Sequence, residues 1–156
     1  MSRFFAILYP EGQINVLIPM TDASSNKRVL VIEDEPHIQE ILKAKSGESG
    51  MEFTFAGNGA EGLVMLREHG PFSSILLDIR MPGSDGMWFL EEKKKDATLP
   101  QTPVIIFSNL SAHDFIDRAI AFGVKGYLVK ANNSVKQIIQ EVRKCADHKA
   151  CTVDRY

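Results

Sequence analysis

The sequence predicts an α/β protein built on a five-stranded parallel sheet with helices on both faces. From residue 29 onward, short runs rich in β-branched residues alternate with segments in which apolar residues recur at helical spacing. Several of the runs are continuously apolar, as expected of strands that are buried on both faces. Because parallel strands need crossover connections, this alternation indicates successive βα units in one doubly wound sheet.

The expected strands differ in how they are covered. Val29-Leu30-Val31-Ile32 is a continuous apolar run, which is typical of a central strand. Met51, Phe53 and Phe55 alternate with polar or smaller residues, which suits a strand at the edge of the sheet. The three remaining strands are expected at residues 75–77, 104–107 and 127–129.

Helices are expected between the strands. Pro36 fits the first turn of a helix that carries Ile38, Ile41 and Leu42 on its apolar face. The apolar stripe of a second helix lies within residues 60–66, and a third helix is expected from about Gly86 to Lys95.

The last two helices have clear end signals. Ser111 and Asp114 are spaced like an N-cap and its capping-box partner, and Gly123 is expected to end the helix that follows. In the final helix the apolar residues fall on one face, and Asn133 or Ser134 is expected to cap it. Those apolar residues are Val135, Ile138, Ile139 and Val142.

Five successive βα units favour the strand order 2-1-3-4-5 of flavodoxin-like folds, because their crossovers are right-handed and the second strand has edge character. In such a sheet the functional crevice lies beyond the carboxyl ends of the strands. The side chains that follow each strand are therefore the first candidates for a functional site.

Three segments are expected along the chain. Residues 1–25 form an N-terminal extension, either a hairpin around Pro10-Glu11-Gly12 or a polar leader, and an isolated hairpin is marginal in water. Residues 26–148 form the main domain. Residues 149–156 are a C-terminal tail, too short to be an output domain, so the chain is expected to act as a stand-alone domain.

Composition excludes several functions. The net charge of −2 argues against direct nucleic-acid binding, which usually requires a basic surface. No apolar run approaches the ~20 residues needed to span a bilayer. Cys145 and Cys151 match neither a zinc nor a redox spacing, so we expect free thiols and a cytoplasmic protein. We expect the protein to be a monomer or a weak dimer.

Polar side chains of complementary chemistry follow four of the expected strands. Glu33 and Asp34 follow the first strand, Asp78 follows the third, Ser108 the fourth and Lys130 the fifth. One carboxylate at a strand end would indicate little, because acidic residues also cap helices there. The full set predicts a single site where the carboxyl ends of the strands meet.

This set of groups has the chemistry of phosphoryl transfer. Two carboxylates ~4 Å apart repel by roughly 4 kcal/mol at an effective dielectric of about 20, and a divalent cation removes that cost. Mg²⁺ prefers hard oxygen ligands and commonly bridges carboxylates to a phosphate. Asp78 can then act as the nucleophile that forms an aspartyl phosphate, with Lys130 offsetting charge on the phosphoryl oxygens.

Two stretches of the sequence resemble the receiver domains of response regulators in two-component signalling. They are Val29-Leu30-Val31-Ile32-Glu33-Asp34-Glu35-Pro36 and the more diagnostic Leu76-Leu77-Asp78-Ile79-Arg80-Met81-Pro82-Gly83-Ser84-Asp85-Gly86. The resemblance covers about residues 28–145. It implies a phosphoacceptor signalling domain and not an enzyme in the usual sense, one that catalyses only its own Mg²⁺-dependent phosphorylation and dephosphorylation.

The resemblance also implies the ligands of the Mg²⁺ ion. Glu33 and Asp34 would be the acidic pair, with Asp34 as a direct ligand. Asp78 would be a further ligand as well as the phosphorylated residue. The backbone carbonyl of Arg80 would complete the protein's ligands.

Further roles follow from the same resemblance. Ser108 would be the switch hydroxyl, Lys130 the lysine that neutralises the phosphate, and Tyr127 the aromatic residue whose orientation follows phosphorylation. The partners would be a sensor histidine kinase or a histidine phosphotransfer protein, and a downstream protein target. The signal would leave by protein–protein contact or by onward phosphotransfer.

The sequence departs from the family pattern at four places. Asn109 stands where a small Ala is commonest, and Ala131 replaces a Pro that often has a cis peptide bond, which is costly before Ala. Ser46-Gly47 is expected to interrupt the end of the first helix, and Lys93 stands where a buried Leu is usual. The first two changes concern switching and the last two concern stability.

Two other functions are compatible with parts of the pattern. A receiver-like interaction module that works without phosphate is the stronger rival, because of Asn109 and Ala131. A phosphohydrolase of the haloacid-dehalogenase type also uses a strand-end Asp, but it needs a second Asp at the position that Arg80 occupies.

Overall fold

The computed structural model describes residues 4–8, 14–19, 27–109 and 113–154. Its main domain is a parallel sheet of five strands in the order β4-β3-β5-β6-β7. The strands are β3 (Lys27–Ile32), β4 (Met51–Ala56), β5 (Ser74–Leu77), β6 (Val104–Ser108) and β7 (Gly126–Val129). Counted from the first strand of this sheet the order is 2-1-3-4-5, so the predicted topology is confirmed.

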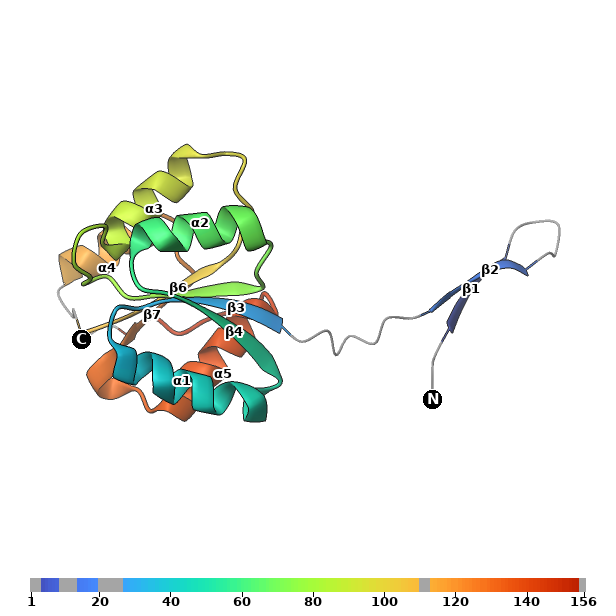
Figure 1. The fold of residues 1–156 in the computed structure, drawn as a ribbon, viewed down its shortest axis with the longest axis horizontal. Coiled ribbons are helices and arrows are strands. Elements are labelled where there is room, and N and C mark those ends of the chain that lie inside the picture. Colours follow the sequence, from blue (N-terminus) through green and yellow to red (C-terminus); the bar gives the residue numbers. More distant parts are fainter. Residues whose placement is uncertain (1–3, 9–13, 20–26, 110–112, 155–156) are drawn as a thin grey trace.

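Five α-helices cover the two faces of the sheet in the described residues (Figure 1). They are α1 (Pro36–Ser49), α2 (Gly59–His69), α3 (Gly86–Lys95), α4 (His113–Ala121) and α5 (Val135–Ala146). Figure 1 shows α2 and α3 over one face, and α1 and α5 over the other. A short 3₁₀ turn, η1 (Lys130–Asn132), links β7 to α5.

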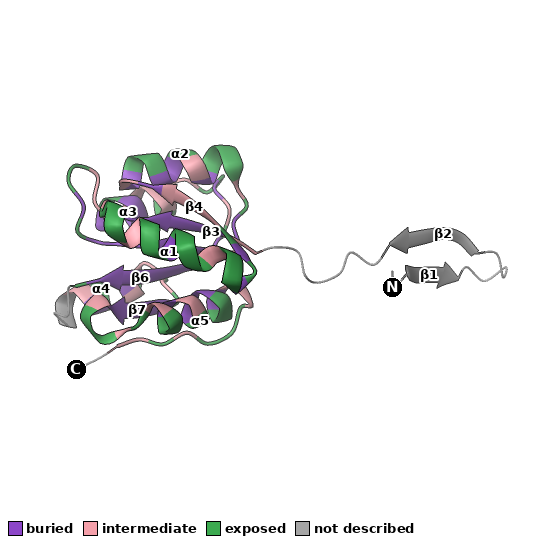
Figure 2. Ribbon diagram, turned by 60° about the horizontal axis from the view of Figure 1, so that its bottom comes forward, coloured by how far each residue is buried: buried purple, intermediate pink, exposed green. Residues whose placement is uncertain are grey.

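Each face of the sheet has its own apolar core. Alternate residues of β3 point to opposite faces, so Leu30 and Ile32 pack under α2 and α3 while Val29 and Val31 pack under α1 and α5. Figure 2 shows β3, β6 and β7 as buried, β4 as mainly intermediate and the outer faces of the helices as exposed. No helix in the described part of the chain has the length and apolarity to cross a membrane.

The N-terminal segment contains two short strands. β1 (Phe4–Leu8) and β2 (Ile14–Pro19) pair antiparallel, with Phe5 opposite Ile18 and Leu8 opposite Ile14. The expected division into an N-terminal extension, a main domain and a tail stays a prediction. The expected turn residues between the strands lie outside the described residues.

Side chains cap the starts of two helices, and the cap of α5 is one that the sequence predicted. The Asp85 carboxylate accepts a hydrogen bond from the Trp88 N–H at the start of α3. Ser134 caps α5 and forms a reciprocal capping box with Gln137. The expected Ser111 cap of α4 lies outside the described residues.

The expected interruption of the first helix is wrong. α1 continues through Ser46 and Gly47 to Ser49, and it ends at Gly50, which has a left-handed backbone conformation. The hydroxyl of Ser46 donates to the Lys43 carbonyl and the hydroxyl of Ser49 donates to the Ser46 carbonyl. These hydroxyls bond to carbonyls of the preceding turn, so both serines are accommodated within the helix where the sequence pattern alone indicated a break.

Candidate phosphoacceptor site

The backbone of neighbouring strands places the acidic residues side by side. The Asp78 N–H donates to the Ile32 carbonyl at 2.9 Å, which continues the β3–β5 pairing one residue beyond β5. Glu33 directly follows β3, so its side chain begins beside Asp78. Both are buried, at 1% and 5% relative exposure.

Lys130 brings a positive charge into this acidic group. Its Nζ lies 2.8 Å from Asp78 Oδ2, 2.7 Å from Glu33 Oε2 and 3.1 Å from Glu35 Oε1. The lysine side chain is only 8% exposed. The structure therefore joins the carboxyl ends of β3, β5 and β7 through one buried ammonium.

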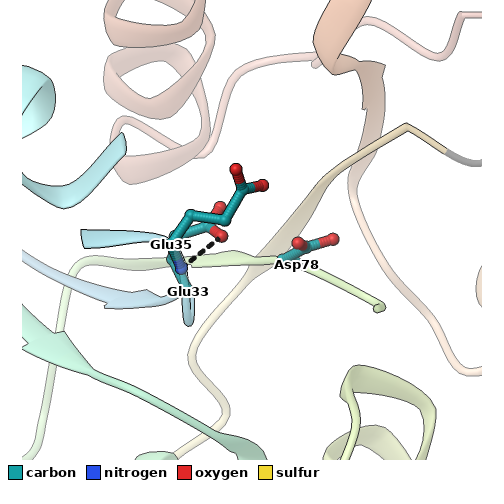
Figure 3. A group of neighbouring side chains, drawn as sticks. All are labelled: Glu33, Glu35 and Asp78. Carbon is teal, nitrogen blue, oxygen red and sulfur yellow. Dashed lines mark hydrogen bonds between the residues drawn. The ribbon is translucent and has the colours of Figure 1, made fainter. Parts of the chain in front are cut away.

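Three acidic side chains gather at this site, and two of them, Glu33 and Asp78, were predicted from the sequence. Oxygen atoms of Glu33, Glu35 and Asp78 all lie within 4.8 Å of one another, and Figure 3 shows the three side chains grouped at the ends of β3 and β5. Glu35 was not predicted as a site residue. The sequence indicated Glu35 only by its position directly after Glu33 and Asp34. The direction in which the chain turns after a strand cannot be predicted from the pattern of apolar residues.

The buried carboxylate of Glu33 is incompletely satisfied. Its Oε1 accepts the Glu35 N–H at 3.2 Å, but its Oε2 is buried and accepts no hydrogen bond of good geometry, although Lys130 Nζ is near. Burial raises the pKa of Glu33, while the Lys130 ammonium lowers it and the Asp78 carboxylate raises it further. A hard cation could bind this oxygen directly, and the donor set of carboxylate oxygens fits Mg²⁺.

Burial and the charges of this cluster together shift the pKa values of two other groups, Lys130 and Tyr127. Burial opposes the charge on Lys130, but Asp78 and Glu33 more than offset it and hold its pKa above the usual value. Burial, with a smaller effect of the Asp78 charge, raises the pKa of Tyr127 to about 12. At neutral pH Lys130 is therefore a cation and Tyr127 a neutral phenol.

A small pocket opens beside Asp78. It has a volume of about 280 Å³ and is lined by Asp34, Glu35, Asp78, Arg80, Ser108 and Asn109. The pocket thus brings Asp34 and Ser108 to the predicted site, although Asp34 is not one of the three grouped acids. Asn109, which replaces the commoner small Ala, is exposed and lines this pocket.

The loop after Asp78 is held against the start of α3. The Arg80 N–H donates to Asp78 Oδ1 at 3.2 Å, and the Gly86 N–H donates to the Ile79 carbonyl at 3.0 Å. A Cβ atom at Gly86 would overlap the Asp78 carbonyl oxygen. Only glycine therefore lets α3 begin so close to Asp78.

Tyr127 lies on β7 with its side chain fully buried in the core under α2, α3 and α4. It is one strand away from Ser108, because β6 pairs with β7 and Ile106 is opposite Tyr127. Every residue that was predicted for the site is therefore found at or behind the carboxyl end of the sheet.

Comparison with known proteins agrees with this geometry. The sequence profile of the response regulator receiver domain matches residues 29–143. The transcriptional regulatory protein AruR of Pseudomonas aeruginosa is 34% identical in an alignment of 128 residues that covers 74% of this chain and 50% of AruR. The transcriptional regulatory protein PdtaR of Mycobacterium tuberculosis is 32% identical, over 72% of this chain and 54% of PdtaR. The chain thus spans only about half the length of these two relatives, and less of others.

Solved structures show the same fold. The receiver domain of the Francisella response regulator 1452 superposes with a TM-score of 0.71 at 30% identity, covering 79% of this chain and 98% of that domain. The chemotaxis response regulator CheY4 of Vibrio cholerae superposes at 0.69 with 21% identity, covering 78% of this chain and 99% of CheY4, a likeness of fold. The chain therefore belongs to the response regulator receiver domains of two-component systems.

Proposed function

We propose that this domain accepts a phosphoryl group on Asp78 in a Mg²⁺-dependent reaction and signals through the change that follows. The observation that supports this most strongly is the buried contact of Lys130 with both Asp78 and Glu33. A buried charge cluster is often no more stabilising than apolar residues of similar volume, so its presence favours a functional role. A pocket of about 280 Å³ beside Asp78 leaves room for a phosphoryl group.

In the proposed reaction an oxygen of the Asp78 carboxylate attacks the phosphorus of a phosphohistidine or an acyl phosphate. The new P–O bond forms on Asp78 as the old P–N or P–O bond breaks, and the electron pair leaves with the donor. The donor would be a histidine kinase or a histidine phosphotransfer protein. Lys130 offsets the charge that develops on the phosphoryl oxygens.

Receiver domains as a class bind Mg²⁺, and the hard oxygen donors here fit that ion. We propose Glu33, Asp34, Asp78 and the backbone carbonyl of Arg80 as its protein ligands. When bound, the ion would neutralise part of the charge on the transferring phosphoryl group. Glu35 is a further candidate, because the structure groups it with Glu33 and Asp78.

The proposed switch uses Ser108 and Tyr127. A phosphoryl group on Asp78 would draw the Ser108 hydroxyl and its loop toward the site, and Tyr127 would fill the vacated space. Two charge-assisted hydrogen bonds at ~1.5–3 kcal/mol each approach the ~5.5 kcal/mol that inverts a 1:99 equilibrium. The altered surface would then be read by a partner protein or by a histidine domain that takes the phosphoryl group onward.

Mass spectrometry tests the phosphoryl transfer. With Mg²⁺ and acetyl phosphate, the protein should gain one phosphoryl mass, and Asp78→Asn should not. Asp85→Asn is a matched control, because Asp85 lies in the same loop and Asn also caps a helix well. If neither acetyl phosphate nor a cognate kinase labels the wild type, a receiver-like interaction module that works without phosphate is favoured.

Thermal unfolding tests the metal ligands separately. Mg²⁺ should raise the melting temperature of the wild type, because it binds the folded acidic site and not the unfolded chain. Asp34→Ala should abolish the rise if Asp34 is a ligand, and Glu35→Gln should reduce it if Glu35 contributes. An equal rise in all three proteins would show that the metal site is elsewhere.

A further inference from the structure

The C-terminal segment extends the sheet along the outer edge of β7. The Tyr127 N–H donates to the Thr152 carbonyl at 3.0 Å, and the Asp154 N–H donates to the Tyr127 carbonyl at 2.8 Å. Val153 is the parallel partner of Tyr127. Both backbone groups of Tyr127 on this side are thus bonded to residues 151–154, which we call the edge segment.

The edge segment is anchored from α5 as well. Its Thr152 N–H donates at 2.8 Å to Oε2 of Glu141, a residue only 7% exposed. Cys151 packs against the apolar core under α5, which contains the buried Cys145. A Cβ atom at Gly126 would lie 3.0 Å from the Cys151 Cβ, so glycine allows the close approach at this end.

The Asp154 carboxylate reaches past the edge to the turn that carries Lys130. Its Oδ2 accepts the Val129 N–H at 2.9 Å and the Asn133 side-chain amide at 2.6 Å. The same Asn133 amide also donates to the Val129 carbonyl at 3.0 Å. One carboxylate oxygen therefore ties together the two residues that flank η1 (Lys130–Asn132).

These bonds fix the point from which the Lys130 side chain starts. The Lys130 ammonium lies within hydrogen-bond distance of Asp78 and of Glu33. The backbone that carries this side chain lies between Val129 and the rest of η1, so the position of the ammonium depends on how those residues are held. Site residues need supporting contacts that hold them to within about 0.5 Å of the productive geometry. Val129 is the last residue of β7 and directly precedes Lys130, and its N–H donates to the Asp154 carboxylate.

We propose that Asp154 is a positioning residue that holds the Lys130 turn in register with Asp78. This rests on the proposed function, since the reaction it supports is the phosphorylation of Asp78. The edge segment thereby connects the outer edge of the sheet to the phosphoacceptor site. Loss of the partners that orient a functional group typically lowers activity about 10- to 100-fold, and a similar loss is expected here.

Phosphorylation kinetics form the first part of the test. Asp154→Asn keeps the shape of the side chain but removes its charge, and it should lower the maximal rate of labelling by acetyl phosphate with little change in the half-saturating donor concentration. Asp154→Glu should restore part of the rate. Asp96→Asn is the matched control, because Asp96 also accepts a backbone N–H and side-chain donors, but at the end of α3.

An NMR measurement tests the positioning without any phosphoryl transfer. The side-chain resonances of Lys130 in the Mg²⁺-free protein should shift in Asp154→Asn and stay unchanged in Asp96→Asn. If the wild type is not labelled at all, the proposed function fails, and the Lys130 resonances still decide the role of Asp154. Lys130 resonances that are unchanged in Asp154→Asn would overturn the proposal. So would an equal loss of labelling rate in both variants.

Discussion

The two edges of the sheet are built differently. β4 forms one edge, and in the described part of the chain it pairs only with β3, with Phe53 and Phe55 half-buried and Glu52 exposed. β7 forms the other edge, and it is buried throughout and covered by residues 151–154. Of the two edge strands, only β7 leads directly into a residue of the charge cluster, Lys130. The comparison teaches that the edge strand which carries the chain into a site residue is the closed one.

Exposed edges have other means of protection. A charged side chain discourages a second chain from pairing with an open strand, and β4 carries the exposed Glu52. After β4 the chain enters the cap of α2 at Asn58, whose side chain accepts the Glu61 N–H. The end of β4 also touches the candidate site, because the Glu33 N–H donates to the Ala56 carbonyl at 2.9 Å.

The largest effect is expected from removing the cation at the end of β7. Lys130→Ala leaves Glu33 and Asp78 buried without a partner, which typically costs about 3–5 kcal/mol of stability. Urea unfolding in Mg²⁺-free buffer measures it, and Mg²⁺ should stabilise this variant more than the wild type. Lys95→Ala, which removes an exposed pair with Glu92, serves as the control and should leave stability unchanged. Equal losses in the two variants would contradict a buried charge cluster.

A smaller effect compares the apolar residues of the two edges. Leu128 on β7 is fully buried, so Leu128→Ala should cost about 2–5 kcal/mol in transfer and cavity terms. Phe53 on β4 is larger but half-buried, and Phe53→Ala should cost less than Leu128→Ala. The urea unfolding midpoints of the two variants, Leu128→Ala and Phe53→Ala, compare these losses of stability directly. The reverse order of midpoints would show that the β4 edge is as tightly packed as the β7 edge.

The smallest effect concerns pH and the edge segment. Burial opposes ionisation of Glu141, but Lys144 and the Thr152 N–H outweigh it and hold its pKa below the usual value of 4.5. A lowered pKa in the folded state adds stability that is present above pH 4.5 and is lost as pH falls through the folded-state pKa. Protection of the Thr152 amide from hydrogen exchange should therefore decline under acid, and Glu141→Gln should remove that pH dependence. An identical decline in this variant would mean that another group anchors the segment.

Much of the fold was predictable because its signals are local. The apolar runs of β3 and β6 and the alternation in β4 have the periods of buried and edge strands, and strand order then followed from chirality. The end of α1 was not predictable, since Ser46 and Gly47 favour a break until the hydroxyl bonds of the last turns are known.

The candidate site was predictable to the same degree. Glu33, Asp34, Asp78 and Lys130 follow strands and Ser108 ends one, so the topology brings all five to one edge of the sheet. The position of Glu35 depends on how the chain turns after β3. The position of Asp154 depends on the outer edge of β7, which exists only once the five strands of the sheet have assembled. Neither leaves a periodic pattern in the sequence.

The most direct test of the account is to locate the phosphoryl group. Borohydride reduces an acyl phosphate to an alcohol, so a phosphorylated aspartate becomes homoserine, which peptide mass spectrometry can place in the sequence. After incubation with Mg²⁺ and acetyl phosphate, we expect homoserine at position 78 alone. Homoserine at Asp34 or Asp85, or a phosphoryl group that borohydride does not remove, would contradict the assignment of Asp78 as the phosphoacceptor.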